Sequence, residues 1–309
     1  MLAFLRLLRP VNLMLIALSM YLVRYCLILP VYAFTVKVNG LIQLNSLIRL
    51  HDLDFCLLVV STVMIAAAGN IINDYFDQTI DTINKPDKQY IGTRIAEKTA
   101  LNWYWVFNAT ALIISFYLSF TKNLQLLLFT QASAMCLLWF YSERFKRKLL
   151  IGNIIVAALS ALVLLLPAIA EPEFYLNFVY AGVYGLFAFL ISLIREVVKD
   201  MEDVEGDLEG GCRTIPIVYG QKTARGISVF FTFILVGFLA WLIYKNFYQN
   251  ALTTIGNILT IVLLPYALLL LFILRAESKK ALHRLSVYIK VLMLLGILSM
   301  IPFYYYFLR

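Results

Sequence analysis

Long apolar runs separated by short polar breaks are the feature of this sequence that most constrains its fold. Each run has about 20 residues, which is the length that a transmembrane helix needs. Hydrophobic residues make up 62% of the chain and charged residues 14%, whereas a soluble domain has about 45–50% and about 25%. A soluble fold is therefore excluded, and we expect an all-α polytopic membrane protein. Nine spans are predicted, at residues 11–34, 55–76, 101–120, 123–142, 150–170, 175–195, 227–246, 252–274 and 286–308.

Basic residues predict the orientation of these spans. Most of the 26 Lys and Arg residues fall at the N-terminus and in the loops at 77–100, 143–149, 196–226 and 275–285. By the positive-inside rule these segments are cytoplasmic, in a protein of the cell (inner) membrane. The net charge of +8 then reflects orientation, and it requires no nucleic-acid partner. No obligate protein partner is inferred, and the lack of linkers predicts one domain over residues 1–309.

Acidic residues are concentrated in two of the cytoplasmic segments. In the first, Asn70, Asp74, Asp77 and Asp81 are spaced i, i+4, i+7 and i+11, which places them on one face of a helix. Carboxylates on one face repel one another, so we expect a cation against them. Hard oxygen ligands at this spacing suit Mg²⁺, which bridges to substrate phosphates. Residues 70–81 are the first acid segment, and Pro86 is expected to end its helix.

A second acid segment repeats this spacing 126 residues later. Glu196, Asp200, Asp203 and Asp207 again fall at i, i+4, i+7 and i+11, and Gly206 leaves the conformation of the last turn open. Residues 196–207 are the second acid segment. Each segment follows an even-numbered predicted span, which indicates an internal duplication. The pattern therefore predicts two carboxylate stripes that face each other.

Two facing carboxylate stripes are suited to one kind of chemistry. They can hold two or three Mg²⁺ ions that clamp a diphosphate and neutralise the charge on a leaving group. An apolar bundle beneath them accepts a long hydrocarbon tail. Together these features indicate ionisation of an allylic diphosphate in a chamber that is shielded from water. The four scattered cysteines and two histidines provide no metal site of their own.

Two motifs resemble those of a known family. NDYFDQTID at 73–81 and KDMEDVEGD at 199–207 resemble the two aspartate-rich motifs of the UbiA superfamily of intramembrane prenyltransferases. The resemblance implies nine transmembrane helices around a central cavity that opens to the cytoplasmic side. It also implies Mg²⁺-dependent transfer of a polyprenyl group from an allylic diphosphate to a lipophilic acceptor within the membrane lipid. Further matches are Arg9-Pro10-Val11-Asn12, Tyr141-Ser142 with Lys146, Gly152-Asn153, and Thr214-Ile215-Pro216 with Gly220.

The residues in and around the two motifs also favour one acceptor. INKPDK at 83–88 and MEDVEGD at 201–207 are most similar to members that alkylate the hydroxyl of a prenylglyceryl phosphate, in ether-lipid synthesis. One loop departs from the family, because Lys88 is followed by Gln89-Tyr90-Ile91-Gly92 where the family has Pro-Ile-Pro-Ser-Gly or similar. The loop over the diphosphate is therefore expected to sit differently.

The expected site residues follow from the stripes and the resemblance. The catalytic carboxylates are Asp74, Asp77, Asp200 and Asp203, and the metal ligands are Asp74, Asp77, Asp81, Asp200, Asp203 and Asp207. The substrate-binding residues are Asn12, Asn70, Asn73, Lys85, Arg94, Lys146, Asn153, Arg195 and Lys199. Asn12 lines the pocket or caps a helix, and Asn153 faces substrate or bonds across helices. Lys146 with Arg147 is the surplus pair expected for an acceptor phosphate.

Three other functions stay open from the sequence. Within the family, the acceptor is alternatively an aromatic quinone precursor of the hydroxybenzoate or dihydroxynaphthoate type. A CDP-alcohol phosphotransferase also uses aspartates and metal in a membrane, but its DG-x2-AR signature is absent. An ion transporter places its acidic residues near mid-membrane, whereas these acids lie at helix ends and in cytoplasmic loops.

Overall fold

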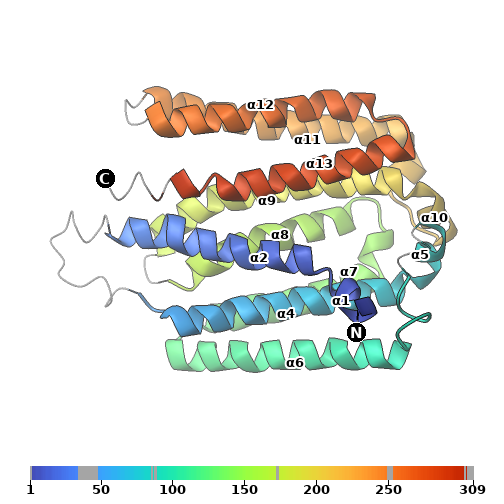
Figure 1. Cartoon of the computed structure of the whole chain (residues 1–309), viewed down its shortest axis with the longest axis horizontal. Coiled ribbons are helices and arrows are strands. Elements are labelled where there is room, and N and C mark those ends of the chain that lie inside the picture. Colours follow the sequence, from blue (N-terminus) through green and yellow to red (C-terminus); the bar gives the residue numbers. More distant parts are fainter. Residues whose placement is uncertain are drawn as a thin grey trace.

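The computed structural model describes residues 2–33, 48–84, 86, 89–171, 174–248, 253–302 and 304. In this part of the chain the regular structure is helical, and long helices lie alongside one another in a bundle (Figure 1). The helices are α1 (Leu2–Leu8), α2 (Pro10–Leu22), η1 (Val23–Ile28), α4 (Asp52–Phe76), α5 (Gln78–Asn84), α6 (Glu97–Lys122), α7 (Gln125–Glu143), η4 (Phe145–Arg147), α8 (Ile151–Ile169), α9 (Phe174–Glu202), α10 (Val204–Glu209), α11 (Ile215–Tyr248), α12 (Thr253–Arg275) and α13 (Lys279–Leu298).

The long helices occur where the sequence predicts spans. Seven helices in the described residues are long and apolar enough to cross a membrane, the first of them running over Pro10–Ala33. The other two predicted spans coincide with α7 and α12. The prediction of an all-α polytopic membrane protein is therefore confirmed.

Several predicted boundaries were wrong because charged residues continue the helices. Helix α9 extends to Glu202 rather than ending near 195. Helix α13 begins at Lys279, where Ser278 accepts a hydrogen bond from the Ala281 amide, rather than near 286. It ends at Leu298, and the last part of the predicted span, which ran to 308, lies partly outside the described residues. A charge at the membrane surface ends an apolar run but not a helix, since Lys and Glu are good helix formers.

Both acid segments bend at the third of their four regularly spaced residues. Helix α4 ends at Phe76, and Asp77 has φ −93° and ψ 6°. Helix α9 ends at Glu202, and Asp203 has φ −97° and ψ 9°. Each bend leads into a short helix, α5 or α10, so the expected continuous stripes are interrupted at equivalent places. Helix α5 ends at Asn84, before Pro86, as predicted. The matching bends support the internal duplication.

The short helices α1, α5 and α10 gather at one end of the bundle, together with the loops that carry most of the basic residues (Figure 1). At the opposite end, Arg24 is buried and its guanidinium contacts Glu171 at 3.1 Å and the Leu50 carbonyl oxygen at 2.6 Å. This buried pair ties the first span to the residues before α4 and after α8.

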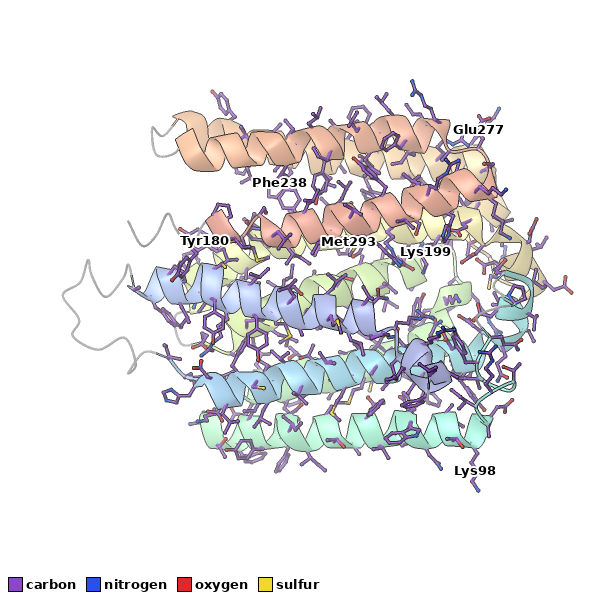
Figure 2. All side chains as sticks on the ribbon, in the orientation of Figure 1. Lys98, Tyr180, Lys199, Phe238, Glu277 and Met293 are labelled. Atoms are coloured by element: carbon purple, nitrogen blue, oxygen red, sulfur yellow. The ribbon has the colours of Figure 1, made fainter. Side chains whose placement is uncertain are left out.

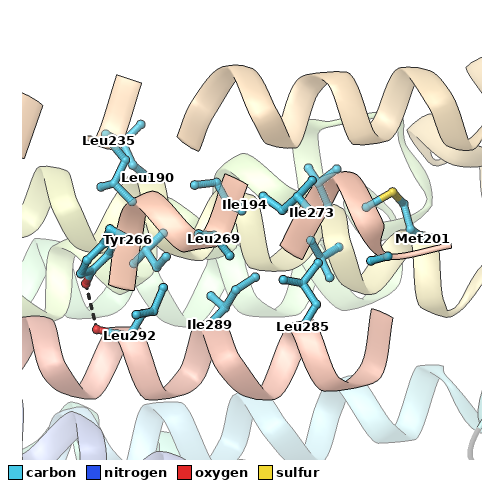
Figure 3. Packing of buried hydrophobic residues seen from close by; sticks show 14 of the residues in the cluster. Leu190, Ile194, Met201, Leu235, Tyr266, Leu269, Ile273, Leu285, Ile289 and Leu292 are labelled. Carbon is cyan, nitrogen blue, oxygen red and sulfur yellow. Dashed lines mark hydrogen bonds between the residues drawn. The ribbon is translucent and has the colours of Figure 1, made fainter. Parts of the chain in front are cut away.

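The largest apolar cluster lies between α9, α11, α12 and α13 (Figure 3). Leu190, Ile194, Leu269 and Ile289 are among its buried members. In the same cluster the Tyr266 hydroxyl donates to the Leu292 carbonyl oxygen at 2.8 Å. This packing holds α9 and α13 together, and so fixes the position of the second acid segment.

Candidate active site

One large cavity runs along the bundle and contains both acid segments. Its volume is about 980 Å³, and α9 contributes lining residues from Tyr180 to Asp200. Tyr180, Met293 and Lys199 follow one another along this side, with Lys199 nearest the end that carries α5 and α10 (Figure 2). At 1.5 Å per residue, the distance from Tyr180 to Asp200 is about 30 Å. The cavity therefore has the depth of a membrane's hydrocarbon core, about 30 Å.

The six predicted metal ligands all line this cavity. They are Asp74, Asp77 and Asp81 from the first acid segment and Asp200, Asp203 and Asp207 from the second. In the part of the chain that the structure describes, no three acidic, histidine or cysteine side chains are close enough together to hold a metal ion. Individual carboxylates instead contact basic and amide side chains.

The first acid segment is paired with two cations from distant parts of the sequence. The Arg9 guanidinium lies 2.5 Å from the Asp74 carboxylate, and the Lys146 ammonium contacts Asp77. Asn73 also donates to Asp77, at 2.8 Å. Burial alone would lower the pKa of Lys146, but the Asp77 carboxylate and its neighbours raise the pKa above its usual value, so the lysine stays charged. Mutual repulsion of the carboxylates led us to expect a cation beside them, and the structure places two there, Arg9 and Lys146.

The sequence indicates Arg9 only as part of the motif Arg9-Pro10-Val11-Asn12. It lies between α1 and α2 with φ 55°, in the left-handed region that few residues other than glycine adopt. This conformation starts α2 at Pro10. The pairing of Arg9 with Asp74 joins residues 65 positions apart, so no local pattern reveals it.

The second acid segment is held by different partners. Asn153 on α8 donates to Asp200 at 2.8 Å and does not line the cavity. Of the two roles left open for Asn153, the structure shows the bond across helices. Glu196 is buried and accepts hydrogen bonds from Arg195 at 2.8 Å and from Lys199 at 3.1 Å. Arg195 and Lys199, both predicted as substrate-binding residues, line the cavity.

Asn84 joins the two acid segments and was not identified from the sequence. Its side chain donates to the Asp203 carbonyl oxygen at 2.9 Å and accepts from the Gly206 amide at 3.0 Å. A Cβ atom on Gly206 would lie 2.5 Å from the Asn84 side-chain nitrogen, so only glycine allows this approach. Gly210 packs as closely against Ile80. The bend at Asp203 is thereby attached to helix α5.

The remaining predicted residues are divided between the cavity and the surface. Asn12, Asn70 and Asn73 line the cavity, and Asn70 donates to the Leu8 carbonyl oxygen at 2.9 Å. Arg94 is exposed and does not line it. Lys85 lies outside the described residues.

Two loops show how the mouth of the cavity is formed. Lys146 lines the cavity but Arg147 is exposed and does not, so the expected surplus pair is separated.

In the loop that departs from the family, Tyr90 lines the cavity and Ile91 is buried. Gly92 has φ 80°, which allows the chain to turn there. The departing sequence thus places a tyrosine beside the acid segments.

Comparison with known sequences identifies relatives over most of the chain. The profile of the UbiA prenyltransferase family matches residues 28–292. A digeranylgeranylglyceryl phosphate synthase from Methanosphaera stadtmanae is 32% identical over 232 residues, which are 75% of this chain and 81% of that protein. The corresponding synthase from Methanothermobacter thermautotrophicus is 33% identical over 251 residues, 80% of this chain and 84% of that protein.

Solved structures share the fold. A structure of digeranylgeranylglyceryl phosphate synthase is similar with a TM-score of 0.65 and 22% identity, covering 98% of this chain and 97% of that one. A UbiA homolog from Archaeoglobus fulgidus, bound to GPP and Mg²⁺, has a TM-score of 0.58 and 17% identity, covering 97% of this chain and 99% of that one. At these identities the likeness concerns the fold.

Proposed function

The chain belongs to the UbiA prenyltransferase family, and from this premise we propose that it transfers a polyprenyl group from an allylic diphosphate to the hydroxyl of a prenylglyceryl phosphate. The observation that carries the proposal is the shared cavity. Two acid segments from distant parts of the chain line one end of it, and apolar side chains such as Leu159, Phe187 and Ile297 line the rest. A diphosphate fits the acid end through bound cations, and its hydrocarbon tail fits the apolar part.

The residues at the acid end suit Mg²⁺. Six carboxylates supply the hard oxygen ligands that Mg²⁺ prefers, and Mg²⁺ needs only one or two of them besides water and phosphate oxygens. Asp74, Asp77, Asp200 and Asp203 are the central ligands that we propose, with Asp81 and Asp207 beside them. Bound there, Mg²⁺ would neutralise charge on the leaving diphosphate.

The protein's own residues supply the rest of the chemistry. Arg9 and Lys146, which contact Asp74 and Asp77, are placed to meet the diphosphate oxygens. The bond between C1 of the prenyl group and the diphosphate oxygen breaks, and its electron pair stays on the diphosphate. The acceptor hydroxyl oxygen then forms an ether bond to C1, and its proton leaves with the diphosphate. The apolar walls exclude water, which would otherwise capture the allylic cation.

The relatives named digeranylgeranylglyceryl phosphate synthase support this acceptor. The test is to offer geranylgeranyl diphosphate with Mg²⁺ and one acceptor at a time: a prenylglyceryl phosphate, a hydroxybenzoate or a dihydroxynaphthoate. Mass spectrometry of the products should show one added geranylgeranyl group on the prenylglyceryl phosphate alone. Addition to an aromatic acceptor instead would overturn the assignment of the acceptor.

We further propose that the acid end faces the cytoplasm in the cell membrane, because the basic loops lie at that end. Single cysteines at Gln78 and Glu209 should react with an impermeant thiol reagent only from the cytoplasmic side. A cysteine at Gln125, which is exposed at the opposite end, should react only from the other side. Labelling of positions 78 and 209 from opposite sides would contradict a shared site.

A further inference from the structure

The two halves of the internal duplication differ just before their acidic residues. In the first half the positions are Gly69, Asn70 and Asn73, which carry no charge. The equivalent positions 126 residues later are Arg195, Glu196 and Lys199. The carboxylates that suit metal are common to both halves, whereas this group of charges belongs to the second half alone. Metal binding, which both halves are proposed to share, therefore does not explain why the second half carries these charged residues.

A third cation, Lys290, lines the cavity at about the same depth as Arg195. Lys290 on α13 lines the cavity within a predicted membrane span. Glu202 and His283 contact each other at 2.8 Å, which sets the register of the antiparallel helices α9 and α13. Arg195 lies seven residues before Glu202 and Lys290 seven residues after His283, so each lies about 10 Å deeper than that contact. A charged side chain inside a membrane span is costly and marks functional positions.

Arg195 also has a buried donor, as Arg24 and Arg225 do. Its Nε is buried and makes no hydrogen bond in the structure, although its Nη1 donates to Glu196. A buried donor without an acceptor costs free energy. A guanidinium presents a fork of donors that matches the oxygens of a phosphate. Arg195 lines the cavity, so the part of its guanidinium that faces the cavity is placed to meet a phosphate there.

Arg195 and Lys199 contact a different carboxylate from the one that each cation of the first acid segment contacts, although Lys146 also acts electrostatically on Glu196. Arg9 and Lys146 contact Asp74 and Asp77, whereas Arg195 and Lys199 contact Glu196. Arg195 also lies five residues before Asp200 on α9, and so about 7 Å farther from the end of the bundle that carries α5 and α10. The cavity thus has two neighbouring groups of cations, Arg9 and Lys146 beside the first acid segment and Arg195, Lys199 and Lys290 on α9 and α13.

We propose that Arg195, Lys199 and Lys290 form the binding subsite for the phosphate monoester of the acceptor lipid, distinct from the cations that meet the donor diphosphate. The inference rests on the proposed function and deepens it. The acceptor's phosphate lies between α9 and α13, and its hydroxyl points toward the acid segments. An acceptor without phosphate gains nothing from this subsite.

The test compares the apparent KM for three substrates in Lys290→Gln and Arg195→Gln: the prenylglyceryl phosphate, the prenylglycerol that lacks the phosphate, and geranylgeranyl diphosphate. Loss of a charge-assisted contact should raise the KM for the phosphorylated acceptor by roughly 10- to 150-fold. The KM values for the donor and for the prenylglycerol should change less than about threefold. Lys290→Arg should keep a KM near that of the wild type. Lys280→Gln, on the same helix outside the cavity, is the matched control.

The KM values distinguish failure of the proposed phosphate subsite from failure of the proposed function. If both substitutions raise the KM of the donor and the acceptor equally, the cations serve the diphosphate and the subsite is overturned. An unchanged KM for the phosphorylated acceptor in both variants overturns it as well. If the wild type alkylates only acceptors without phosphate, the proposed function itself fails. Because Arg195→Gln also disturbs the buried Glu196, Lys290→Gln keeps the test valid should the arginine variant not fold.

Discussion

Replacing Asp74 or Asp200 by alanine should lower the rate of prenyl transfer by roughly 10²–10³, the loss expected when one charge-stabilising contact to a leaving group is removed. The two residues occupy equivalent places in the two acid segments, and both line the cavity. If the segments act together, neither half alone neutralises the departing diphosphate. The measurement is the initial rate with saturating geranylgeranyl diphosphate and Mg²⁺.

A matched control comes from the same region. Glu209 is exposed on α10 and does not line the cavity, so Glu209→Ala should keep the rate of the wild type. Thermal unfolding of each variant separates a catalytic loss from misfolding. Near wild-type turnover in both aspartate variants would contradict a site built from the two acid segments.

Asn84→Ala should weaken the apparent affinity for Mg²⁺ by about 10- to 100-fold, the usual cost of losing a residue that orients metal ligands. Asn84 touches no substrate in this account. It positions the second acid segment by bonding to the Asp203 carbonyl oxygen and the Gly206 amide. The initial rate as a function of Mg²⁺ concentration tests this role, and saturating Mg²⁺ should restore most of the maximal rate.

Two further variants distinguish positioning from general destabilisation. Gly206→Ala should reproduce the effect, because its Cβ would displace the Asn84 side chain. Gly182→Ala, on α9 with no atom within 4 Å of the added Cβ, should not. A maximal rate that stays low at saturating Mg²⁺, with an unchanged Mg²⁺ dependence, would argue against the positioning role.

The sequence predicted those site residues that recur at helical spacing within a short segment. The i, i+4, i+7 spacing is visible within a dozen residues, and it identified six carboxylates that line one cavity. The contacts of Arg9 with Asp74, Lys146 with Asp77 and Asn84 with Asp203 join residues 65, 69 and 119 positions apart. Such contacts depend on how the helices pack, which no local pattern encodes.

Charged residues misled the prediction of helix ends, and one charged residue that lines the cavity was not identified from the sequence. The apolar run predicted that the span ends near 195, although α9 continues to Glu202, with Glu196 buried and in contact with Arg195 and Lys199. Lys290 is not distinguished by the sequence pattern, because a single lysine in an apolar run only weakens the hydropathy signal. Its place beside the cavity follows from the register of α13 against α9.

The position of bond cleavage tests the central claim most directly. Geranylgeranyl diphosphate labelled with ¹⁸O in the bridge between C1 and phosphorus is converted with a prenylglyceryl phosphate, and the products are weighed by mass spectrometry. Transfer of the prenyl group predicts that all of the ¹⁸O leaves in the diphosphate and none remains in the lipid product. Retention of ¹⁸O on the prenyl group would mean that the phosphorus–oxygen bond breaks, as in a phosphotransferase, and would contradict the account.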